Sequence, residues 1–342
     1  MRKINWGIIG YGNAAKSFIK AISQVQNANI YGISSVTNFK NLIEKKREKN
    51  FQNIKIFNDH INLLSDTKVD AIYVALTNDL HFKWIMNSLN FNKNVLTEKP
   101  SCTNSVDFKK CNNLSEKKKI IFTEAIMYRH HPQTLKIIDI IKSGLIGNVK
   151  NIKNFCGFDI GKKILGIEIK KLNYNSRLLN KNLGGGAILD LGCYPLSMSI
   201  LIAGINNPII QIEKVISKER KIGKSNVDEV ATIELLFSNN IYSYSQVAIR
   251  KKLDDLVLIE GTKGYLKITN PWLPDKNFSL ELNLLNGRKE IFNYKCEKEV
   301  FVYLIENVSN AILFKKKLEY PIISSEETML YLEIIDKWNL NL

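Results

Sequence analysis

An acid and a phenol stand four residues apart in the segment GGGAILDLGCYP, residues 184–195. In a helix, residues i and i+4 lie on one face, so the carboxylate of Asp190 and the phenol of Tyr194 would point the same way. Together they could accept a hydrogen bond from a bound hydroxyl group and transfer its proton. The alternative is a packed helix in which Asp190 caps a helix end and Tyr194 fills space.

A glycine-rich turn near the N-terminus, GYGNAA, has the GxGxxA spacing at Gly10, Gly12 and Ala15. Gly10 would permit a tight turn, Gly12 would let the backbone approach a pyrophosphate, and Ala15 would allow a helix to pack closely on a strand. The N–H groups at the start of that helix would then face the phosphates. Because the motif follows the first strand of an α/β series, it predicts a dinucleotide site more strongly than a merely structural turn.

The expected end of the second strand reads GISSVTNFK, residues 32–40. An NAD site usually carries a carboxylate there, which holds the ribose 2′-hydroxyl. This stretch has Ser34 and Ser35 instead, with Lys40 nearby. Since a carboxylate would repel a 2′-phosphate whereas hydroxyls and a lysine would tolerate one, the stretch favours NADP and leaves NAD possible.

Other polar residues follow later strands, at the carboxyl edge where parallel sheets bind dinucleotides. One lysine is usually a surface charge, and Lys99 gains weight only from the residues near it. Those expected at the same edge are Thr77, Asn78, His81 and Glu98, and those expected at the domain junction are Arg129, His130 and His131. His130 is equally well explained by a structural or surface role.

The elements that must position these residues change character along the chain. Residues 4–124 alternate short apolar runs with helical patterns, which predicts a parallel sheet covered on both faces. Residues 149–295 carry longer alternating segments, which predict a mainly antiparallel, open-faced sheet, and helical patterns follow at 300–313 and 324–338. We therefore expect two domains: a dinucleotide-binding Rossmann domain of the α/β class at 1–122, and an α+β domain for substrate binding and dimerisation at 123–342.

Composition limits the classes of function. Five scattered cysteines without a CxxC pair argue against a disulfide framework or a zinc site, and for a reducing cytoplasm. No apolar run approaches the roughly 20 residues of a membrane span, and the N-terminus enters a strand at once, so we expect neither membrane insertion nor a signal peptide. The formal net charge of +16 is spread along the chain without an aromatic-interleaved basic stripe. Anionic small molecules fit this charge better than nucleic acid does.

The order and spacing of GYGNAA, TNDLH, EKP, EAIMYRHHPQ and GGGAILDLGCYP resemble the glucose–fructose oxidoreductase/inositol dehydrogenase (Gfo/Idh/MocA) family. The later VDEVATIELLFSN and IEGTKGYLKITNPW resemble its second domain, so the resemblance covers nearly the whole chain. The pattern EAxMYRxHPQ followed by Asp-x-x-x-Tyr is similar to the branch of dihydrodiol dehydrogenases, xylose dehydrogenases and glucose–fructose oxidoreductases. In the inositol dehydrogenase branch a histidine takes the place of Tyr194.

The resemblance implies an NAD(P)-dependent oxidoreductase that transfers a hydride between the cofactor and a carbinol or carbonyl carbon of a sugar, sugar derivative or polyol. A tyrosine with a pKa near 10 is a poor base at neutral pH, but the ammonium of a nearby lysine favours the phenolate. Tyr194 is then the acid/base, Lys99 its electrostatic partner and a ribose contact, and Asp190 an acceptor for a substrate hydroxyl. A non-catalytic NADP-binding sensor or scaffold is the alternative, and three intact catalytic residues argue against it.

The remaining site residues and the assembly complete these expectations. His131 and Arg177 join Asp190 and Tyr194 as substrate-binding residues. Because one face of the second sheet has to be covered, we expect a homodimer or homotetramer formed through it. The cofactor-binding residues are Gly10, Gly12, Asn13, Ala14, Ala15, Ser35, Thr77, Asn78, His81, Glu98, Lys99 and Arg129.

Overall fold

The computed structural model describes residues 2–48, 51–161, 163–164, 167–168, 172–207 and 210–340. The chain forms two compact units. The first contains Met1–His130 and Lys298–Ser325, and the second contains His131–Glu297 and Glu326–Leu342. Residues 298–325, which the division at 122/123 placed with the second domain, thus pack with the first unit.

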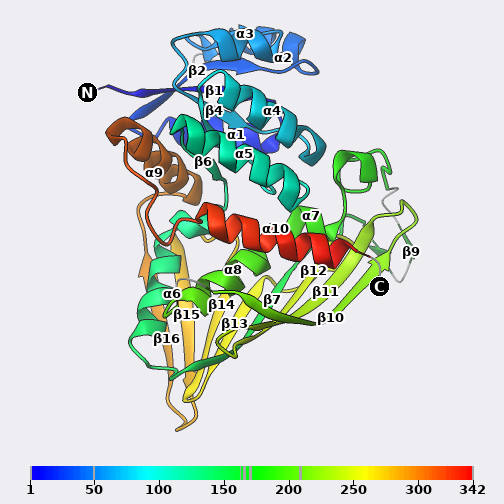
Figure 1. The fold of residues 1–342 in the computed structure, drawn as a ribbon, viewed down its shortest axis with the longest axis vertical. Helices are drawn as coiled ribbons and strands as arrows, with labels where there is room; N and C mark the ends of the chain where they lie inside the picture. The colour runs from blue at the N-terminus through cyan, green and yellow to red at the C-terminus, as the bar shows by residue number, and fades with distance from the viewer. Residues whose placement is uncertain are drawn as a thin grey trace. The chain divides into compact units, whose positions relative to one another are not determined.

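The first unit is built on a six-stranded parallel sheet in the order β3-β2-β1-β4-β5-β6 (Figure 1). Its apolar strands are covered by helices, which confirms the predicted α/β class. Helix α3 (His60–Ser65) was not predicted from the sequence, because its six residues carry too little periodicity to be recognised. The strands are β1 (Ile4–Ile9), β2 (Ala28–Ser34), β3 (Lys55–Phe57), β4 (Ala71–Val74), β5 (Asn94–Thr97) and β6 (Phe122–Glu124), and the helices are α1 (Asn13–Ile22), α2 (Phe39–Lys45), α3 (His60–Ser65), α4 (Asn78–Asn90) and α5 (Ser105–Lys118), with a 3₁₀ turn η2 (Met127–His130).

A helix from the C-terminal part of the chain completes the core of this unit. Helix α9 (Val300–Phe314) packs against α1, β1 and β2. Its residues Val302, Ile305 and Val308 are fully buried in one cluster with the apolar residues of the sheet. The indole N–H of Trp6 donates to Ser309 Oγ at 3.0 Å, which fixes α9 to the first strand.

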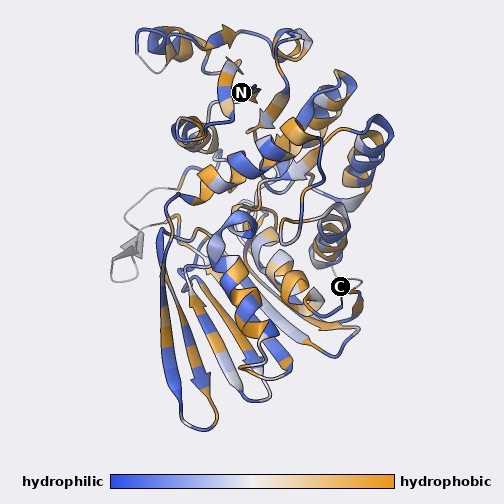
Figure 2. Cartoon of the chain, turned by 90° about the vertical axis from the view of Figure 1, so that its left-hand side faces the viewer, coloured by the Kyte–Doolittle hydropathy of each residue, from blue (hydrophilic) through white to orange (hydrophobic). Residues whose placement is uncertain are grey.

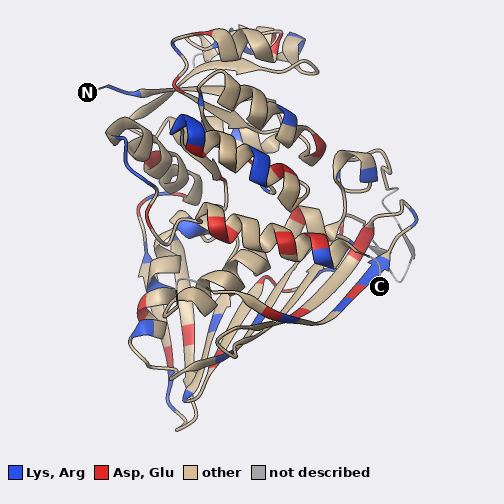
Figure 3. Ribbon diagram, in the orientation of Figure 1, with Lys and Arg blue, Asp and Glu red and all other residues tan. Residues whose placement is uncertain are grey.

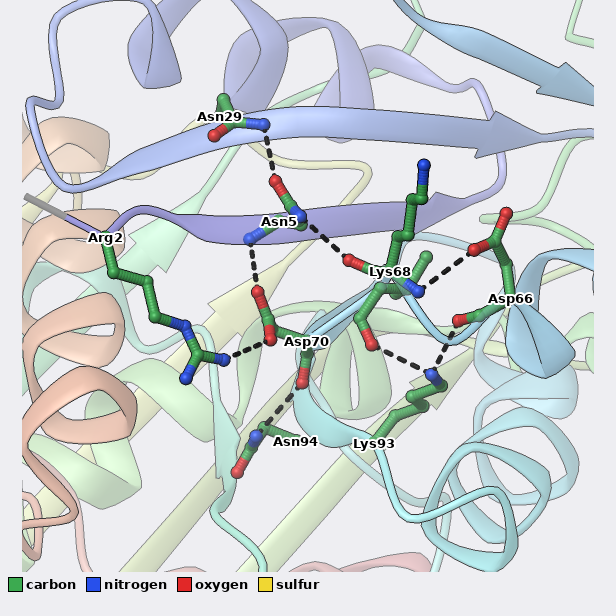
Figure 4. Close-up of polar contacts among 9 residues, drawn as sticks. Arg2, Asn5, Asn29, Asp66, Lys68, Asp70, Lys93 and Asn94 are labelled. Atoms are coloured by element: carbon green, nitrogen blue, oxygen red, sulfur yellow. Dashed lines mark hydrogen bonds and ion pairs between the residues drawn. The ribbon is translucent and has the colours of Figure 1, made fainter.

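Polar side chains at the amino edge of the same sheet serve its stability (Figure 4). Asp70 accepts hydrogen bonds from Arg2 Nη2 at 2.8 Å and from the backbone N–H of Asn5 at 2.9 Å. The buried ammonium of Lys93 donates to the carbonyl oxygens of Asp66 and Val69, each at 2.8 Å. Burial lowers the pKa of Lys93, and these carbonyls supply the partners that a buried charge requires. The carboxyl edge of the sheet is left for binding.

The second unit contains an eight-stranded sheet in the order β10-β11-β12-β7-β13-β14-β15-β16. Neighbouring strands are antiparallel except β7 and β12, which run parallel, so the prediction of a mainly antiparallel sheet is confirmed. A separate pair of short strands is antiparallel. The strands are β7 (Val149–Gly157), β10 (Ile212–Ile222), β11 (Asp228–Phe237), β12 (Tyr242–Ala248), β13 (Leu256–Gly261), β14 (Gly264–Thr269), β15 (Asn277–Leu284) and β16 (Lys289–Lys295), with β8 (Lys163–Ile164) and β9 (Ile167–Glu168) as the short pair.

Inner strands of the large sheet bury about every second side chain. In β11, Ala231, Ile233 and Leu235 are buried, whereas Thr232 and Glu234 are half-exposed, and Figure 2 shows the same alternation of hydrophobic and hydrophilic residues along the strands. Helices α7 and α8 contact β7, β11 and β12, so they cover the buried face in this region. The helices of this unit are α6 (Pro132–Lys142), η3 (Lys181–Leu183, 3₁₀), α7 (Ala187–Leu191), α8 (Cys193–Gly204) and α10 (Ser325–Asn339).

One helical stretch, Lys181–Gly204, is long and apolar enough to cross a membrane by length and composition alone. The expectation that no apolar run approaches such a length is therefore corrected. Within its most apolar window 94% of the residues are buried inside the protein, as in the core helix of a globular protein. The apolar side chains of α8 face other parts of the protein, which explains why helical amphipathicity is absent there.

Candidate active site

The turn after β1 has the geometry that a pyrophosphate needs. Gly10 has φ +100°, and a Cβ there would lie 2.2 Å from the carbonyl oxygen of Ala75, so only glycine fits between the ends of β1 and β4. These two strands are neighbours at the point where the strand order reverses, which is the binding crevice of such sheets. Gly12 is exposed, and a Cβ there would meet no atom within 4 Å. The backbone at Gly12 is therefore open to a ligand.

Helix α1 begins directly after this turn. Its N-cap is Gly12, which supplies no side-chain hydrogen bond to the first-turn amides. Asn13 is exposed and Ala14 half-exposed, whereas Ala15 is fully buried against the sheet. The three predicted roles of the GxGxxA motif thus have matching geometry, and the arrangement can accept a dinucleotide phosphate at the helix N-terminus.

The end of β2 carries two buried hydroxyl groups. Ser34 Oγ lies 2.6 Å from His60 Nδ1, and Ser35 Oγ accepts the amide N–H of Asn38 at 3.3 Å. Ser35 is only 3% exposed, while Val36, Thr37 and Lys40 around it are exposed. A ribose substituent at this edge would meet backbone, a serine O–H that can still donate, and exposed lysine.

The ends of β4 and β5 are joined through a histidine. His81 is fully buried on α4, with Nδ1 2.7 Å from the Pro100 carbonyl oxygen and Nε2 3.1 Å from that of Leu76. A neutral ring has one N–H, and the shorter distance assigns it to Nδ1. Burial lowers the pKa of His81, although both carbonyls oppose this. This position favours a structural role for His81, in which it holds the turn after Lys99, over the predicted direct contact with a cofactor.

The other residues predicted at this edge lie near that turn. Thr77 is half-exposed at the N-cap of α4, and Asn78 is buried. Glu98 accepts a hydrogen bond from the hydroxyl of Tyr73. Lys99 is half-exposed, and the amide N–H of the residue two positions later, Ser101, donates to Glu124. The backbone on both sides of Lys99 is thus fixed by buried polar contacts.

The segment EAIMYRHHPQ is almost entirely buried. Arg129 is 1% exposed, and His130 accepts a hydrogen bond from Asn307 on α9 through Nδ1 at 3.3 Å. Burial lowers the pKa of His130 to about 3. Both residues therefore act inside the first unit, and the structural role weighed for His130 is the one that its position favours.

His131 makes contacts with its own part of the fold. It is fully buried at the N-cap of α6, where Nδ1 accepts the amide N–H of Gln133 at 3.1 Å. The proton of the neutral ring must then lie on Nε2, which is 3.3 Å from Cys296 Sγ. Burial lowers the pKa of His131 to about 4. These contacts give His131 a structural role, and its contact with a substrate stays a prediction.

In the second unit, Asp190 and Tyr194 lie on one continuous helical path. Gly192, between α7 and α8, keeps helical dihedral angles of φ −60° and ψ −28°. The Gly192 amide donates to Ile188 O at 2.8 Å, and Leu196 donates to Gly192 O at 3.2 Å. The i, i+4 relation therefore holds, and the two side chains share a face. Both are nearly buried, Asp190 at 3% and Tyr194 at 6% exposure.

Arg177 forms an ion pair with Asp190. Its Nη1 lies 2.7 Å from Asp190 Oδ1, and the arginine side chain is 52% exposed against 4% for the aspartate. The sequence suggested both residues for substrate binding, but their direct contact could not be read from a spacing of 13 residues. The two opposite charges of the pair balance each other.

Two residues of this region carried no assigned role from sequence. Trp272 has its ring centroid 6.1 Å from that of Tyr194, and its indole N–H donates to Phe155 O at 3.0 Å. Asp228, the first residue of β11, accepts the amide N–H of Ile188 at 2.7 Å. The alternating pattern predicted a strand around Asp228, and family resemblance alone pointed to the segment that contains Trp272. An acid at the start of a strongly apolar strand was the one available signal for Asp228.

The glycines that precede α7 are required by contacts within the unit. A Cβ on Gly185 would lie 2.7–2.8 Å from the carbonyl oxygens of Arg177, Leu178 and Asn180. Gly186 has φ +111°, and a Cβ there would lie 2.3 Å from Asp228 Oδ1. These contacts explain the glycines without invoking a ligand. Among the described residues, no group of three or more His, Cys, Asp or Glu side chains could hold a metal ion.

The sequence matches two domain models of one protein family. Residues 4–126 match a model described as the oxidoreductase family with an NAD-binding Rossmann fold. Residues 134–267 match the GFO/IDH/MocA C-terminal domain. The two matches fall on the two units and include every residue assigned to cofactor or substrate binding, from Gly10 to Tyr194, except Arg129 and His131.

Similar proteins align with most of the chain or nearly all of it. Trans-1,2-dihydrobenzene-1,2-diol dehydrogenase of Mus musculus is 24% identical, over 98% of this chain and 95% of its own length. D-xylose 1-dehydrogenase (NADP(+)) of Hypocrea jecorina is 27% identical, over 78% of this chain and 72% of its own. The crystal structure of KijD10, a 3-ketoreductase from Actinomadura kijaniata in complex with NADP and TDP-benzene, has a TM-score of 0.82 at 21% identity, covering 98% and 96% of the two chains. At that identity the likeness establishes the fold.

Proposed function

The chain belongs to the Gfo/Idh/MocA family of oxidoreductases, and from this premise we propose that it transfers a hydride between NADP and a carbinol or carbonyl carbon of a sugar, sugar derivative or polyol. The observation that carries the proposal is the pairing of Asp190 and Tyr194 on one helical face, with Arg177 bound to the aspartate. We further propose a cytoplasmic protein that works as a homodimer or homotetramer.

The bound nicotinamide would supply hydride chemistry, and the protein would supply orientation and proton transfer. Gly10, Gly12 and the first-turn amides of α1 hold the phosphates in this proposal. Tyr194 removes the hydroxyl proton during oxidation and returns it during reduction. We assign Lys99 the role of the cation that favours the phenolate form during turnover. Asp190 accepts a hydrogen bond from a hydroxyl of the substrate.

The charge-balanced Arg177–Asp190 pair supports an uncharged, hydroxyl-rich substrate. Arg177 can donate to hydroxyl oxygens from its exposed end, while Asp190 accepts from hydroxyl hydrogens. An anionic substrate would compete with Asp190 for the guanidinium and weaken the ion pair of a nearly buried carboxylate, which is costly. A neutral polyol or aldose avoids that cost.

NADP is proposed over NAD because β2 ends in serines followed by exposed Lys40, without a carboxylate. Two of the similar proteins support this choice by what their own names state, a D-xylose dehydrogenase that uses NADP(+) and a ketoreductase in complex with NADP. The Rossmann domain of the family leaves NAD as a weaker second cofactor.

A panel assay tests the proposal. Aldoses, polyols and nucleotide sugars are each incubated with NADP+ or NAD+, and the corresponding carbonyl compounds with NADPH or NADH, while absorbance of the reduced cofactor is followed. Turnover with at least one neutral sugar or polyol, greater with NADP+, is the expected result. Tight NADPH binding without turnover of any panel compound would overturn the enzymatic proposal in favour of a non-catalytic sensor.

A further inference from the structure

The helix that carries Asp190 and Tyr194 begins without a capping side chain of its own. Its N-cap is Gly186, which has no side chain that could accept a hydrogen bond from the first-turn amides. Such amides are normally satisfied by a Ser, Thr, Asp or Asn at the N-cap. Here the acceptor comes from forty residues later in the chain, because Asp228 Oδ2 accepts the Ile188 N–H at 2.7 Å.

Several observations indicate that this cap is built in and not incidental. Asp228 is 6% exposed, although aspartate rarely stays buried without specific partners. The backbone amides of both Ala187 and Ile188 hydrogen-bond to its carboxyl group. Gly186 adopts φ +111° and leaves space that any Cβ would remove, since that atom would lie 2.3 Å from Asp228 Oδ1. Gly186 and Asp228 therefore form one capping arrangement, in which the glycine leaves the space that the carboxyl group occupies.

The cap formed by Asp228 has a direct geometric consequence for the proposed catalytic residues. Asp190 lies in the first turn of α7, and its amide N–H donates to Gly186 O at 3.1 Å. Tyr194 follows one turn later on the same helical path. Fixing the first turn fixes the axial position and rotation of both side chains. Arg177 restrains the Asp190 carboxylate but not the start of the helix.

We propose that Asp228 is a positioning residue, which sets the Asp190–Tyr194 helix by capping its first turn from strand β11. This inference rests on the proposed function for its catalytic consequence, but the cap itself is independent of it. A carboxylate is suited to this place because the N-terminal end of a helix favours negative charge. The charge also makes the two hydrogen bonds to backbone amides stronger than neutral ones.

Three variants separate the possible outcomes. Asp228→Ala removes the cap, and Asp228→Asn keeps the shape and one acceptor oxygen without the charge. Glu229→Gln is the matched control, because adjacent residues of a strand project to opposite faces. It changes charge equally, one residue away and off the capped helix. Tyr194→Phe reports separately on the proposed function.

Amide hydrogen exchange of residues 187–191 in the protein without ligands, together with kcat and KM for D-xylose and NADP+, provides the readouts. We expect faster exchange in Asp228→Ala and an intermediate rate in Asp228→Asn. Misplaced reacting groups should lower kcat by roughly 100-fold in the alanine variant, with partial rescue in the asparagine variant and an unchanged KM for NADP+. Glu229→Gln should behave as wild type in both readouts.

Wild-type exchange at residues 187–191 in Asp228→Ala would overturn the cap and the inference with it. Faster exchange with wild-type kcat in a protein whose Tyr194→Phe variant is inactive would overturn the positioning role alone. If Tyr194→Phe keeps full activity, the proposed function fails instead, and the exchange data still decide whether Asp228 holds the helix.

Discussion

Burial raises the pKa of the Asp228 carboxyl to about 6, while hydrogen bonds from Ile188, Ala187 and its own backbone, and the charge of Arg220, act in the opposite direction. Because the folded-state pKa lies above the ordinary 3.8, this group stabilises the fold most at low pH. That contribution is lost as the pH rises through about 6. The ionised carboxylate of Asp228 caps the helix best, but keeping this buried group ionised lowers the stability of the fold.

Comparison of Asp228→Asn with wild type isolates this effect. The asparagine cannot ionise, so its unfolding free energy relative to wild type should rise between pH 4.5 and pH 7, by on the order of 2 kcal/mol. Urea unfolding of both proteins at several pH values measures the difference. A difference that stays constant with pH would show that the carboxyl of Asp228 titrates normally.

Cofactor choice is also decided by a single residue in our account. Ser35→Asp keeps an acceptor for the Asn38 amide and adds a charge that repels a 2′-phosphate but accepts from a 2′-hydroxyl. Wild type should bind NADPH at least as tightly as NADH, and the variant should prefer NADH. Fluorescence titration with both cofactors measures this, and a clear NADH preference in wild type would contradict the assignment.

At the scale of single residues, the sequence predicted the chemical type of the site residues better than their exposure. Residue type and spacing predicted Asp190, Tyr194 and the GxGxxA glycines. His81 and His131 were assigned to binding because a histidine near a sheet edge or domain junction often faces a ligand. Their burial depends on tertiary packing, which brings the carbonyls of Leu76 and Pro100 to His81 and the Gln133 amide to His131. No local pattern encodes those partners.

For two glycines at helix starts, we predict opposite effects of substitution by alanine on stability and on cofactor binding. Gly12 has open space where a Cβ would stand, so Gly12→Ala should leave the stability of the protein unchanged and weaken NADPH binding. Gly186 has positive φ and faces Asp228, so Gly186→Ala should lower the unfolding free energy by about 1–3 kcal/mol. NADPH titration and urea unfolding of both variants distinguish the two. Equal behaviour would contradict the roles given to these glycines.

Elements were predictable wherever apolar residues repeat over several turns or strand positions. The period-two pattern of β11 and the continuous apolar run of β1 correspond to observed strands. The attachment of α9 to the first unit was not predictable, because its apolar face shows only that it packs somewhere. Its partners, Trp6 and the residues of α1, precede it by almost three hundred residues.

The whole molecule carries its excess of positive charge without gathering it on one element. Figure 3 shows acidic and basic residues interspersed along the ribbon of strands and helices, and ion pairs such as Lys153–Glu260 and Lys267–Glu281 link neighbouring strands.

Self-association through the eight-stranded sheet is a prediction for the intact protein. Half-exposed Tyr242, Tyr244 and Leu236 lie on strands next to charged residues of both signs, which suits a face that meets its own copy. Static light scattering at micromolar concentration should give two or four times the chain mass of 39.2 kDa. A monomer under these conditions would contradict the predicted assembly.

The central claim is that Tyr194 transfers the proton in an oxidoreductase reaction, and Tyr194→Phe tests it most directly. The substitution removes one oxygen and keeps the ring beside Trp272, so folding and NADPH binding should hardly change. Tyr265→Phe, at an exposed tyrosine of the same unit, serves as the control. Steady-state kinetics should show kcat lowered by roughly 10²–10⁴-fold in Tyr194→Phe, with little change in KM. Wild-type kcat in Tyr194→Phe would contradict the account.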